Sequence, residues 1–428
     1  MQAVIICGGK GKRISRYIKN TPKGLIKIGE KTNIEHQISL LKKNGINNFL
    51  FLTNNYHKTI KKFIEKKKLK KCRIHKDNFY FGPGGALFGA KNFLDKKFIV
   101  LLSDVFISMN IKKFISYSLN KKTDCTIVSH SNSHPKDSDT VEFDKRGKVT
   151  SIIFKNSKKN KINSSMAGVY FFKKKFLNKL KFKKNHSYDL VKNIIGKSFK
   201  NNIFSYHTIE YIKDFGTIER LKKVRNDIKL KLHIKNIYNK KKAAVFLDRD
   251  GVINREIGPI RNPKNLKLLK NSSKAIKLLN ERQIPCFLIT NQSIISKRKI
   301  TINNFKSLIA KLDNELSKVN AYIDDLRICP NSDKKKINVR KHYFLSKYRK
   351  PNPGMLFEIK KKHNIDLKKS FYVGDTDIDM LTSYNAKCRK ILLLNEKKMK
   401  KYKYNVLPDW IVLNLQTAVK KIILKKIK

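Results

Sequence analysis

The sequence predicts a chain of two α/β domains, and three observations support this prediction. With 428 residues the chain exceeds the usual size of one hydrophobic core, so two domains of about 200 residues each are expected. Short apolar segments alternate with amphipathic ones along both halves, as in parallel α/β layers. The alternation stops in the charged, weakly periodic stretch 222–242, where we expect a linker. The predicted domains are therefore residues 1–235 and 240–428.

The first half begins with the elements of a sheet. Four apolar segments are predicted strands, with the sequences AVIICGG, NFLFLT, FIVLLSD and DCTIVSH. Between the first two, NIEHQISLLKKNG predicts a helix, because an Asn starts it and a Gly ends it. From residue 139 to 172 the pattern changes to hairpin-like strands, TVEFDKRGKVTSIIF followed by AGVYFF. We therefore expect a Rossmann-like mixed sheet.

The second half restarts the alternation with different motifs. Its predicted strands are AAVFLD, CFLITNQ, DDLRICP, SFYVGD and KILLL. The segment INNFKSLIAKLDNELSKV predicts a long helix between two of them. Most of residues 251–287 are expected to form one helix, which leaves no room for a large cap domain over the sheet. The prediction is a capless Rossmannoid domain.

Composition restricts the class of protein. Hydrophobic residues make up 40% of the chain and aromatic residues 10%, which is enough for globular cores. The six cysteines include no CxxC pair, which fits a reducing compartment better than a disulfide framework. The strand pattern begins at residue 2 and no apolar run approaches membrane-spanning length. We expect a cytoplasmic protein with no signal peptide and no membrane partner, and homo-oligomerisation is left open.

The formal charge of +66 is the most extreme feature of the composition. The excess is nearly all Lys, spread along the chain together with Asn and Ile, as an AT-rich coding sequence would produce. Nucleic-acid modules more often gather Arg and aromatic residues on one element. We therefore expect no nucleic-acid partner, although any basic surface attracts phosphorylated substrates.

A glycine-rich loop follows the first predicted strand. There VIIC runs into Gly8, Gly9, Lys10 and Gly11, and Arg13 comes soon after. Glycines let backbone N–H groups turn toward a phosphate without interference from a Cβ, and an arginine adds positive charge. A tight strand-to-helix turn explains such a loop equally well, so the loop alone is weak evidence for a nucleotide site.

Further groups suited to a nucleotide follow this loop in order. Lys23 stands on a turn next to a proline, and Gly84 and Gly85 would let the backbone approach a flat base closely. Asp104 follows the strand FIVLLSD at its carboxyl end, where open α/β sheets bind ligands, and Asp214 supplies a second acid. Taken singly, Asp104 would also fit an acid that caps a loop after a strand.

This order of motifs resembles the sugar-1-phosphate nucleotidyltransferases over residues 1 to about 225, through GGKGKR, PKGL, GPGGA, LLSD, AGVYFF and DFGT. The resemblance implies a GT-A-like fold and attack of a sugar 1-phosphate on the α-phosphorus of an NTP, with release of pyrophosphate. It also implies that Arg13 and Lys23 neutralise phosphate charge while Asp104 and Asp214 hold Mg²⁺. Gly8, Gly9, Gly11, Gly84 and Gly85 would contact the nucleotide.

The first half departs from the family pattern at two places. The family loop usually carries Thr at the position of Lys12. A sugar-contacting Glu-Lys pair that precedes the AGVYFF strand appears here as Phe154 and Lys155. Lys155 therefore stays a candidate for binding the sugar phosphate, without its usual acidic neighbour.

The second half begins with a pair of acids. In FLDRDG, Asp248 can attack a phosphoryl group, and Asp250 can protonate the leaving alcohol and later activate water. Two such close anions require a cation, so Mg²⁺ is expected. Thr290 ends the strand LITNQ with a hydroxyl for a phosphoryl oxygen, and Lys350 stands on a proline-flanked turn. A DxDG pair by itself also occurs in solvated turns and calcium loops.

Two more acids follow the strand FYVG and complete the predicted metal site. These are Asp375 and Asp379, so the expected ligands of this site are Asp248, Asp250, Asp375 and Asp379. A capless site must select its substrate with loops. Asn291, Arg349 and the segment 254–262 are the candidates for this role.

The ordered set resembles the haloacid dehalogenase phosphatases over residues 243 to about 400. DRDGVIN, TNQS and RKPNPGM are most similar to the branch of heptose bisphosphate and histidinol-phosphate phosphatases. That branch typically carries a zinc loop, Cys-Pro-His followed by Cys-x-Cys. Here Cys329-Pro330 is followed by Asn331, and Ser346 and Tyr348 stand at the later positions. A lone cysteine cannot make a structural zinc site, so Mg²⁺ is expected in both domains and no zinc.

The two halves together indicate a bifunctional enzyme. A phosphatase that removes the distal phosphate of a sugar bisphosphate leaves a sugar 1-phosphate, which is the substrate of the first domain. The pairing resembles heptose activation, so we expect a heptose 1,7-bisphosphate, GTP and GDP-heptose for a surface polysaccharide such as lipopolysaccharide. Alternatives are another hexose 1-phosphate, with a histidinol-phosphate-like or DNA 3′-phosphatase-like second domain, and a scaffold with one inactive half.

Overall fold

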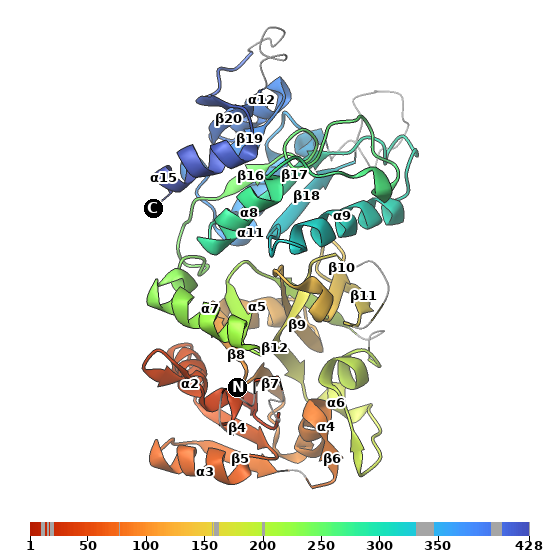
Figure 1. Cartoon of the computed structure of the whole chain (residues 1–428). Coiled ribbons are helices and arrows are strands. Elements are labelled where there is room, and N and C mark those ends of the chain that lie inside the picture. The colour runs from red at the N-terminus through yellow and green to blue at the C-terminus, as the bar shows by residue number, and fades with distance from the viewer. Residues whose placement is uncertain are drawn as a thin grey trace. The chain divides into compact units, whose positions relative to one another are not determined.

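The computed structural model divides the chain into two compact units, and each is described by itself (Figure 1). It describes residues 1–9, 13–14, 17, 21–76, 78–155, 157, 162–198, 202–330, 346–394 and 405–427. The first unit consists of Met1–His130, Ser138–Ser157 and Ser164–Ile237. The second consists of Tyr238–Lys428 together with the short segments Ser131–Asp137 and Lys158–Asn163.

The first unit is built on a nine-stranded mixed sheet, as predicted. Its main path runs in the order β11-β10-β12-β7-β1-β4-β5, with β9 beside β12 and β14 beside β9. The strands are β1 (Gln2–Ile6), β4 (Asn48–Thr53), β5 (Cys72–Lys76), β7 (Lys97–Leu102), β9 (Cys125–His130), β10 (Thr140–Phe143), β11 (Val149–Ile153), β12 (Ser165–Lys173) and β14 (Ile203–His207). β1, β4, β5 and β7 are parallel, whereas β12 runs antiparallel to β7 and β9.

Both faces of this sheet are buried. Successive side chains of a strand point to opposite faces, so Ala3 and Ile5 join one core cluster while Val4 and Ile6 join another. The helices of the unit are α2 (Asn33–Lys43), α3 (His57–Lys66), α4 (Gly82–Gly89), α5 (Ile111–Asn120), α6 (Lys175–Asn178) and α7 (Ile218–Lys229). The helix predicted over 33–45 is α2, which begins at a capping box between Thr32 and Glu35.

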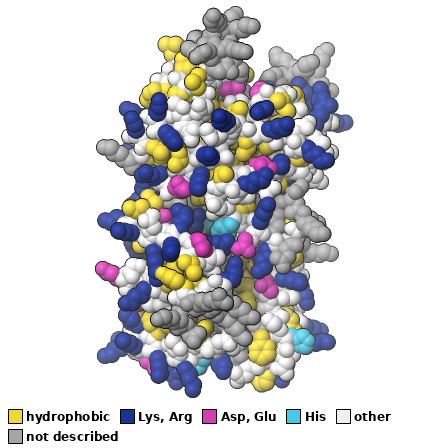
Figure 2. All heavy atoms as spheres, viewed as in Figure 1, with side chains coloured by type: hydrophobic (Ala, Val, Ile, Leu, Met, Phe, Trp, Pro, Cys, Tyr) yellow, Lys and Arg dark blue, Asp and Glu magenta, His cyan; other side chains and the backbone are white. Residues whose placement is uncertain are grey.

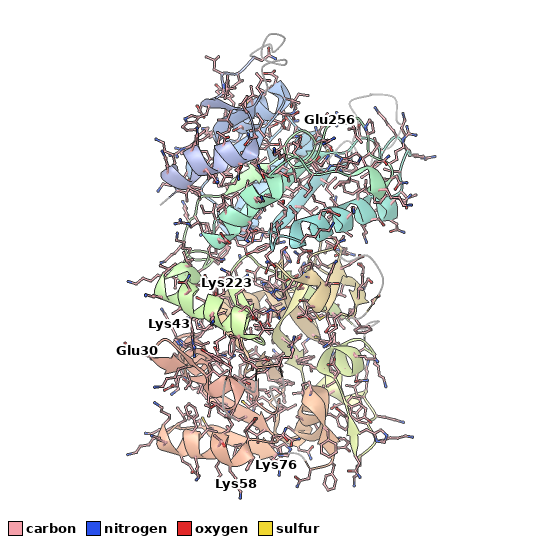
Figure 3. The ribbon with its side chains drawn as sticks, viewed as in Figure 1. Glu30, Lys43, Lys58, Lys76, Lys223 and Glu256 are labelled. Atoms are coloured by element: carbon pink, nitrogen blue, oxygen red, sulfur yellow. The ribbon has the colours of Figure 1, made fainter. Side chains whose placement is uncertain are left out.

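The prediction that residues 222–242 form a linker is wrong for most of that stretch. Residues 218–229 form α7, in which Leu221, Val224 and Asp227 are buried, and Lys223 (labelled in Figure 3) is 3.2 Å from Asp227. After it, the ring of His233 packs edge-on against Phe106 and Tyr211 of the first unit. The many lysines of this stretch occupy its solvent side, so the apolar positions at helical spacing are too sparse to stand out in the sequence.

The second unit holds a six-stranded parallel sheet, also as predicted. Its order is β18-β17-β16-β19-β20-β21, and all neighbours are parallel. The strands are β16 (Val245–Leu247), β17 (Cys286–Asn291), β18 (Asp325–Cys329), β19 (Phe371–Gly374), β20 (Arg389–Leu393) and β21 (Trp410–Val412). From β16 the chain proceeds first toward β18 and later toward β21. The switch between β16 and β19 is where open α/β sheets bind ligands.

Helices cover both faces of this sheet. The longer ones are α8 (Ser272–Glu281), α9 (Ile302–Ser317), α11 (Gly354–His363) and α12 (Asp377–Asn385). α8 and α9 pack with Val245, Leu247 and Leu288 in one core cluster, whereas His363 of α11 stacks on Phe287 at the other face. The described helices include none that is both long and apolar enough to span a bilayer.

The expectation that most of 251–287 is one helix is wrong. α8 covers only Ser272–Glu281. The preceding stretch contains Gly258, Pro259 and Pro263, and these residues favour turns over a continuous helix. No cap domain interrupts the described chain between β16 and β17, so the second unit is a capless Rossmannoid domain.

Candidate active sites

The two acids predicted in the first unit lie at one place. Asp104 follows β7, and β8 (Val105–Ser108) pairs antiparallel with β15 (Tyr211–Asp214). The register sets Asp214 opposite Val105, and the Phe215 N–H donates to the Asp104 carbonyl oxygen over 3.1 Å. Two acids far apart in the sequence therefore lie on adjacent backbone segments near the carboxyl end of β7.

Each of these acids is paired with a cation. Lys23 Nζ is 2.7 Å from Asp104 Oδ2, and Arg220 Nη1 is 2.7 Å from Asp214 Oδ2. A Cβ on Gly216 would lie 3.2 Å from Arg13 Nη2 and 3.4 Å from Asp214 Oδ2, so the Arg13 guanidinium also borders this acid. Sequence reasoning missed Arg220, whose only signal is its place one turn after the DFGT motif.

The glycines of the first loop differ in their surroundings. Gly8 follows β1 half-buried, and its carbonyl oxygen accepts a hydrogen bond from Asn55 Nδ2 at 3.2 Å. Gly9 is exposed, and among the described atoms a Cβ there would meet nothing within 4 Å. Gly11 and Lys12 lie outside the described residues. Within the part of the chain that the structure describes, the space beside Gly9 is therefore unfilled.

Gly84 and Gly85 lie in the first turn of α4, and the fold itself requires their lack of a side chain. A Cβ on Gly84 would lie 2.8 Å from the Asp189 carbonyl oxygen, and one on Gly85 2.8 Å from the Tyr80 carbonyl carbon. Close backbone packing thus explains both glycines without a nucleotide. Lys155 is exposed in the turn after β11, where its N–H donates to Asp139 Oδ1 at 2.8 Å.

In the second unit three acids converge at the carboxyl ends of the central strands. Asp248 follows β16 and its N–H donates to the Val373 carbonyl oxygen on β19 over 3.1 Å. One carboxylate oxygen each from Asp248, Asp375 and Asp379 lie within 4.8 Å of one another, and all three residues are buried. Buried carboxylates at this spacing are the donor set that a hard divalent cation prefers.

Lys350 lies between two of these acids. Its Nζ is 2.9 Å from Asp248 Oδ1 and 2.6 Å from Asp379 Oδ1. Burial by itself would lower the pKa of Lys350, but the two carboxylates outweigh it and raise that pKa well above its usual value. Burial raises the pKa of Asp248 to about 7, although the positive charge of Lys350 opposes this.

Two glycines allow the acids to come this close. A Cβ on Gly251, whose φ is +77°, would overlap the Asp375 carboxylate, and one on Gly374 would overlap Asp379. Asp379 also forms a capping box with Thr376 at the start of α12, where its Oδ2 accepts from the Thr376 N–H at 3.2 Å and from Thr376 Oγ1 at 2.6 Å. The Tyr372 hydroxyl donates to its Oδ1 at 3.3 Å. The carboxylate of Asp379 is therefore held from several sides.

Asp250 is placed differently from the other predicted ligands. Its carboxylate accepts from Arg249 Nε and Nη2, from Asn254 Nδ2 and from Gln292 Nε2, at 2.7 to 3.2 Å. It is not one of the three acids that converge, so a metal contact through this carboxylate does not fit the arrangement. Sequence reasoning assigned no role to Arg249 and Gln292, which lie inside the motifs DRDGVIN and TNQS, and it considered Asn254 only as part of the substrate-selecting segment 254–262.

Side chains at the carboxyl end of β17 form hydrogen bonds with neighbouring groups of the site. The Thr290 hydroxyl accepts from Gln292 Nε2 at 2.9 Å. Asn291 Oδ1 accepts from the Lys350 N–H at 3.1 Å, and its Nδ2 donates to the Lys350 carbonyl oxygen at 3.2 Å. The amide of Asn291 thus fixes the backbone of Lys350, a role that the prediction of substrate contact did not include. Arg349, the other substrate candidate, is half-buried beside it.

Two further predicted features concern loops and charge. Glu256, labelled in Figure 3, belongs to the segment 254–262, where its carboxylate accepts from the Gly258 N–H at 2.8 Å. Cys329 is buried at the end of β18, and most of the predicted metal-free loop, 331–345, lies outside the described residues. Figure 2 shows Lys and Arg side chains spread over the visible face of the molecule rather than gathered on one element.

Comparisons with known proteins match each half separately. Residues 2–230 match the family described as "Nucleotidyl transferase", and residues 243–387 match "Polynucleotide kinase 3 phosphatase". The D-glycero-D-manno-heptose-1,7-bisphosphate 7-phosphatase of Thermosynechococcus vestitus is 33% identical over 184 residues, which are 42% of this chain and 94% of that protein. The D-glycero-beta-D-manno-heptose-1,7-bisphosphate 7-phosphatase of Escherichia coli K12 is 30% identical over 182 residues, with the same coverage.

Solved structures resemble each half as well. HddC from Yersinia pseudotuberculosis, complexed with GMP-PN, covers 53% of this chain and 99% of its own, with 22% identity and a TM-score of 0.45. D,D-heptose 1,7-bisphosphate phosphatase from B. bronchiseptica, complexed with magnesium and phosphate, covers 43% of this chain and 99% of its own. Its identity is 23% and its TM-score 0.38.

Proposed function

The chain belongs to the nucleotidyl transferase family and to the D-glycero-D-manno-heptose-1,7-bisphosphate 7-phosphatase family, and on this basis we propose that it catalyses two consecutive reactions. The second unit removes the 7-phosphate from D-glycero-D-manno-heptose 1,7-bisphosphate. The first unit then transfers GMP from GTP to the remaining sugar 1-phosphate, which releases pyrophosphate and gives GDP-heptose. We place both reactions in the cytoplasm.

The convergence of Asp248, Asp375 and Asp379 around Lys350 carries the phosphatase proposal. Asp248 attacks the phosphorus, and Lys350 holds its carboxylate in place and offsets negative charge on the phosphoryl group. The Thr290 hydroxyl donates to a phosphoryl oxygen. Asp250 gives a proton to the leaving alcohol and afterwards takes one from the attacking water.

The charges around this site fit a divalent cation. Three buried carboxylates, those of Asp248, Asp375 and Asp379, each bring an oxygen within 4.8 Å of the others, and Lys350 is ion-paired with two of them. We propose that Mg²⁺ is held by Asp248, Asp375 and Asp379, where it would screen the nucleophile from the negative phosphoryl group. No zinc site is proposed, and elemental analysis of the purified protein tests this.

In the first unit we propose that Asp104 and Asp214 would hold Mg²⁺, which would offset negative charge on the phosphates. Lys23 and Arg13 lie beside these acids and would contact the phosphates instead once the acids bind a metal. The reaction needs no nucleophilic side chain, because the oxygen of the sugar phosphate attacks. Backbone N–H groups of the loop at Gly8 and Gly9 would bind the nucleotide.

The order of the two reactions follows from their chemistry. Removal of the distal phosphate leaves the anomeric phosphate in place, and this phosphate is the nucleophile for nucleotidyl transfer. Joining the two domains in one chain keeps the second site near the first, which raises the effective concentration of the intermediate there.

A panel of sugar bisphosphates and NTPs, with products identified by mass, tests the proposal. Heptose 1,7-bisphosphate with GTP should give GDP-heptose, inorganic phosphate and pyrophosphate. An oligonucleotide with a 3′-phosphate belongs in the same panel, because residues 243–387 match a family of polynucleotide 3′-phosphatases. Preferred cleavage of the oligonucleotide would overturn the assignment of the sugar. Preferred use of another NTP would overturn only the assignment of the base.

A further inference from the structure

An arginine lies between the two acids that open the phosphatase site. Arg249 is 1% exposed, and its Nε and Nη2 donate to the carboxylate of the next residue, Asp250. We infer that Arg249, together with Asn254 and Gln292, positions Asp250 for proton transfer to the leaving alcohol. This inference rests on the proposed phosphatase function.

Five hydrogen bonds reach the Asp250 carboxylate from these three residues. Arg249 Nε lies 3.0 Å from Oδ1 and 3.1 Å from Oδ2, and Nη2 lies 2.7 Å from Oδ2. Asn254 Nδ2 lies 2.8 Å from Oδ1, and Gln292 Nε2 lies 3.2 Å from Oδ2. A planar guanidinium fixes a carboxylate in orientation as well as in position, which a single lysine nitrogen does not.

The three side chains that donate hydrogen bonds to Asp250 are themselves buried in the unit. Asn254 is 0% and Gln292 5% exposed, whereas the Asp250 side chain keeps 18% of its surface accessible. The Arg249 guanidinium also lies over the ring of Phe305 on α9, 5.9 Å from its centroid, so its own position is fixed by packing. Arg249, Asn254 and Gln292, which we call the clamp, therefore restrain the Asp250 carboxylate and leave it accessible to a substrate.

The Gln292 amide connects Asp250 to a second predicted catalytic group. Its Nε2 lies 2.9 Å from Thr290 Oγ1 and 3.2 Å from Asp250 Oδ2. The Thr290 hydroxyl is proposed to bind a phosphoryl oxygen, and Asp250 to protonate the leaving oxygen of the same phosphate group. Gln292 thus fixes the spacing between the Thr290 hydroxyl, which contacts a phosphoryl oxygen, and the Asp250 carboxyl group, which contacts the leaving oxygen.

In both chemical steps, each bond that forms is matched by a bond that breaks. Asp248 forms a bond to phosphorus while the bond from phosphorus to the alcohol oxygen breaks, and the proton of Asp250 moves to that oxygen. Water then attacks the phosphorus of the aspartyl-phosphate, its proton moves to Asp250, and the Asp248 carboxylate leaves, so inorganic phosphate is released. A clamp that positions Asp250 acts on the proton transfers and leaves the attack by Asp248 unaffected.

Loss of the clamp should therefore slow substrates to an extent that depends on the leaving group, whereas loss of a merely structural residue should slow all substrates alike. An alkoxide is a poor leaving group without a proton, whereas p-nitrophenolate leaves without one. Loss of a general acid costs on the order of 10²–10⁴ in rate where the proton is needed. Misplacing Asp250 should therefore slow alkyl phosphates strongly and leave the first turnover of p-nitrophenyl phosphate almost unchanged.

The test compares Arg249→Met and Arg249→Lys with the wild-type chain. First-turnover release of alcohol or phenol is measured in Mg²⁺ buffer with glucose 6-phosphate, phenyl phosphate and p-nitrophenyl phosphate. For Arg249→Met we expect at least a hundredfold loss with glucose 6-phosphate, a smaller loss with phenyl phosphate and less than threefold with p-nitrophenyl phosphate. Arg249→Lys should show the same trend with smaller losses, and it replaces the methionine variant if that variant does not fold.

Arg327→Met is the matched control, because Arg327 is a half-buried arginine of the same unit that pairs with Asp325 and Glu358. It should affect all three substrates alike. Equal losses for all substrates in Arg249→Met, or no loss for any, would overturn the inference. Asp248→Asn tests the proposed function separately: if it keeps full turnover, the proposed nucleophile is wrong whatever the Arg249 variants do.

Discussion

Replacing Lys350 with methionine should make the stability of the phosphatase unit depend on a divalent cation. Methionine keeps much of the length of lysine and removes the charge. In the native unit this charge is 2.9 Å from Asp248 and 2.6 Å from Asp379, and all three side chains are nearly inaccessible. Without it, the buried carboxylates of Asp248 and Asp379 both lose their ion pair with Lys350.

The magnitude follows from the burial of these groups. Removing one partner of a buried ion pair costs about 3–5 kcal/mol, because the other charge stays buried without compensation. A bound dication restores the compensation. At a Mg²⁺ concentration of 100 times the dissociation constant, binding adds about 2.7 kcal/mol of stability. Most of the stability that Lys350→Met loses should therefore be missing in EDTA and be restored by Mg²⁺.

The chain offers a selective probe for this measurement. Trp410 is the only tryptophan in the sequence and lies in β21 of the phosphatase unit, with its ring centroid 5.9 Å from that of Phe371. Its fluorescence during urea unfolding reports on this unit within the full chain. The wild type and Lys350→Met are compared in EDTA and in millimolar Mg²⁺, and the free energy of unfolding is obtained for each.

Lys362→Met serves as the control, because Lys362 pairs with Asp325 at 2.9 Å in the same unit but away from the three converging acids. It should lower stability equally with and without Mg²⁺. If Lys350→Met were as stable as the wild type in EDTA, or if Mg²⁺ did not restore the stability of Lys350→Met, the electrostatic account of the site would be refuted.

Three more outcomes are expected. Asp248→Asn should abolish phosphate release and leave nucleotidyl transfer near normal, whereas Lys23→Ala should do the reverse; loss of both activities in one folded variant would contradict two separate sites. Burial raises the pKa of Asp248 to about 7, so in EDTA the folded unit keeps a proton that the unfolded chain releases near pH 4. Stability seen by Trp410 should therefore fall as pH rises from about 4 to about 7, and Asp248→Asn should flatten this slope. Limited trypsin digestion should cut after the exposed Lys240 or Lys241 before it cuts in the packed stretch 226–237, and early cleavage there would contradict its packing.

The positions of the proposed catalytic acids could be predicted from the sequence because the signals are local. An apolar strand that ends in an acid places that acid at the edge of the sheet, wherever the strand lies in it. Asp104, Asp248 and Asp375 were found in this way, and the structure brings Asp248 and Asp375 to neighbouring strand ends. The alternation of strands and helices likewise predicted both sheets.

Pairings between distant segments were decided only by the tertiary structure. No pattern in the sequence indicates that Gln292 reaches Asp250 or that Asn291 holds the backbone of Lys350. Each contact depends on strand register and on the direction in which a loop returns. These are set by packing over the whole unit, which a motif of a few residues does not encode.

The same reason explains the linker and the glycines of α4. The stretch around His233 is rich in lysine and gives a weak apolar pattern, yet it packs on Phe106 and Tyr211 once the sheet presents those rings. Gly84 and Gly85 predicted a close approach of a base to the backbone, and the structure adds that each also lies close to the backbone of Asp189 or Tyr80. The sequence by itself determined which residues stand at strand ends and turns, because backbone preferences act over a few residues. Which of them touch was decided by tertiary packing, because that depends on surfaces formed by segments far apart in the chain.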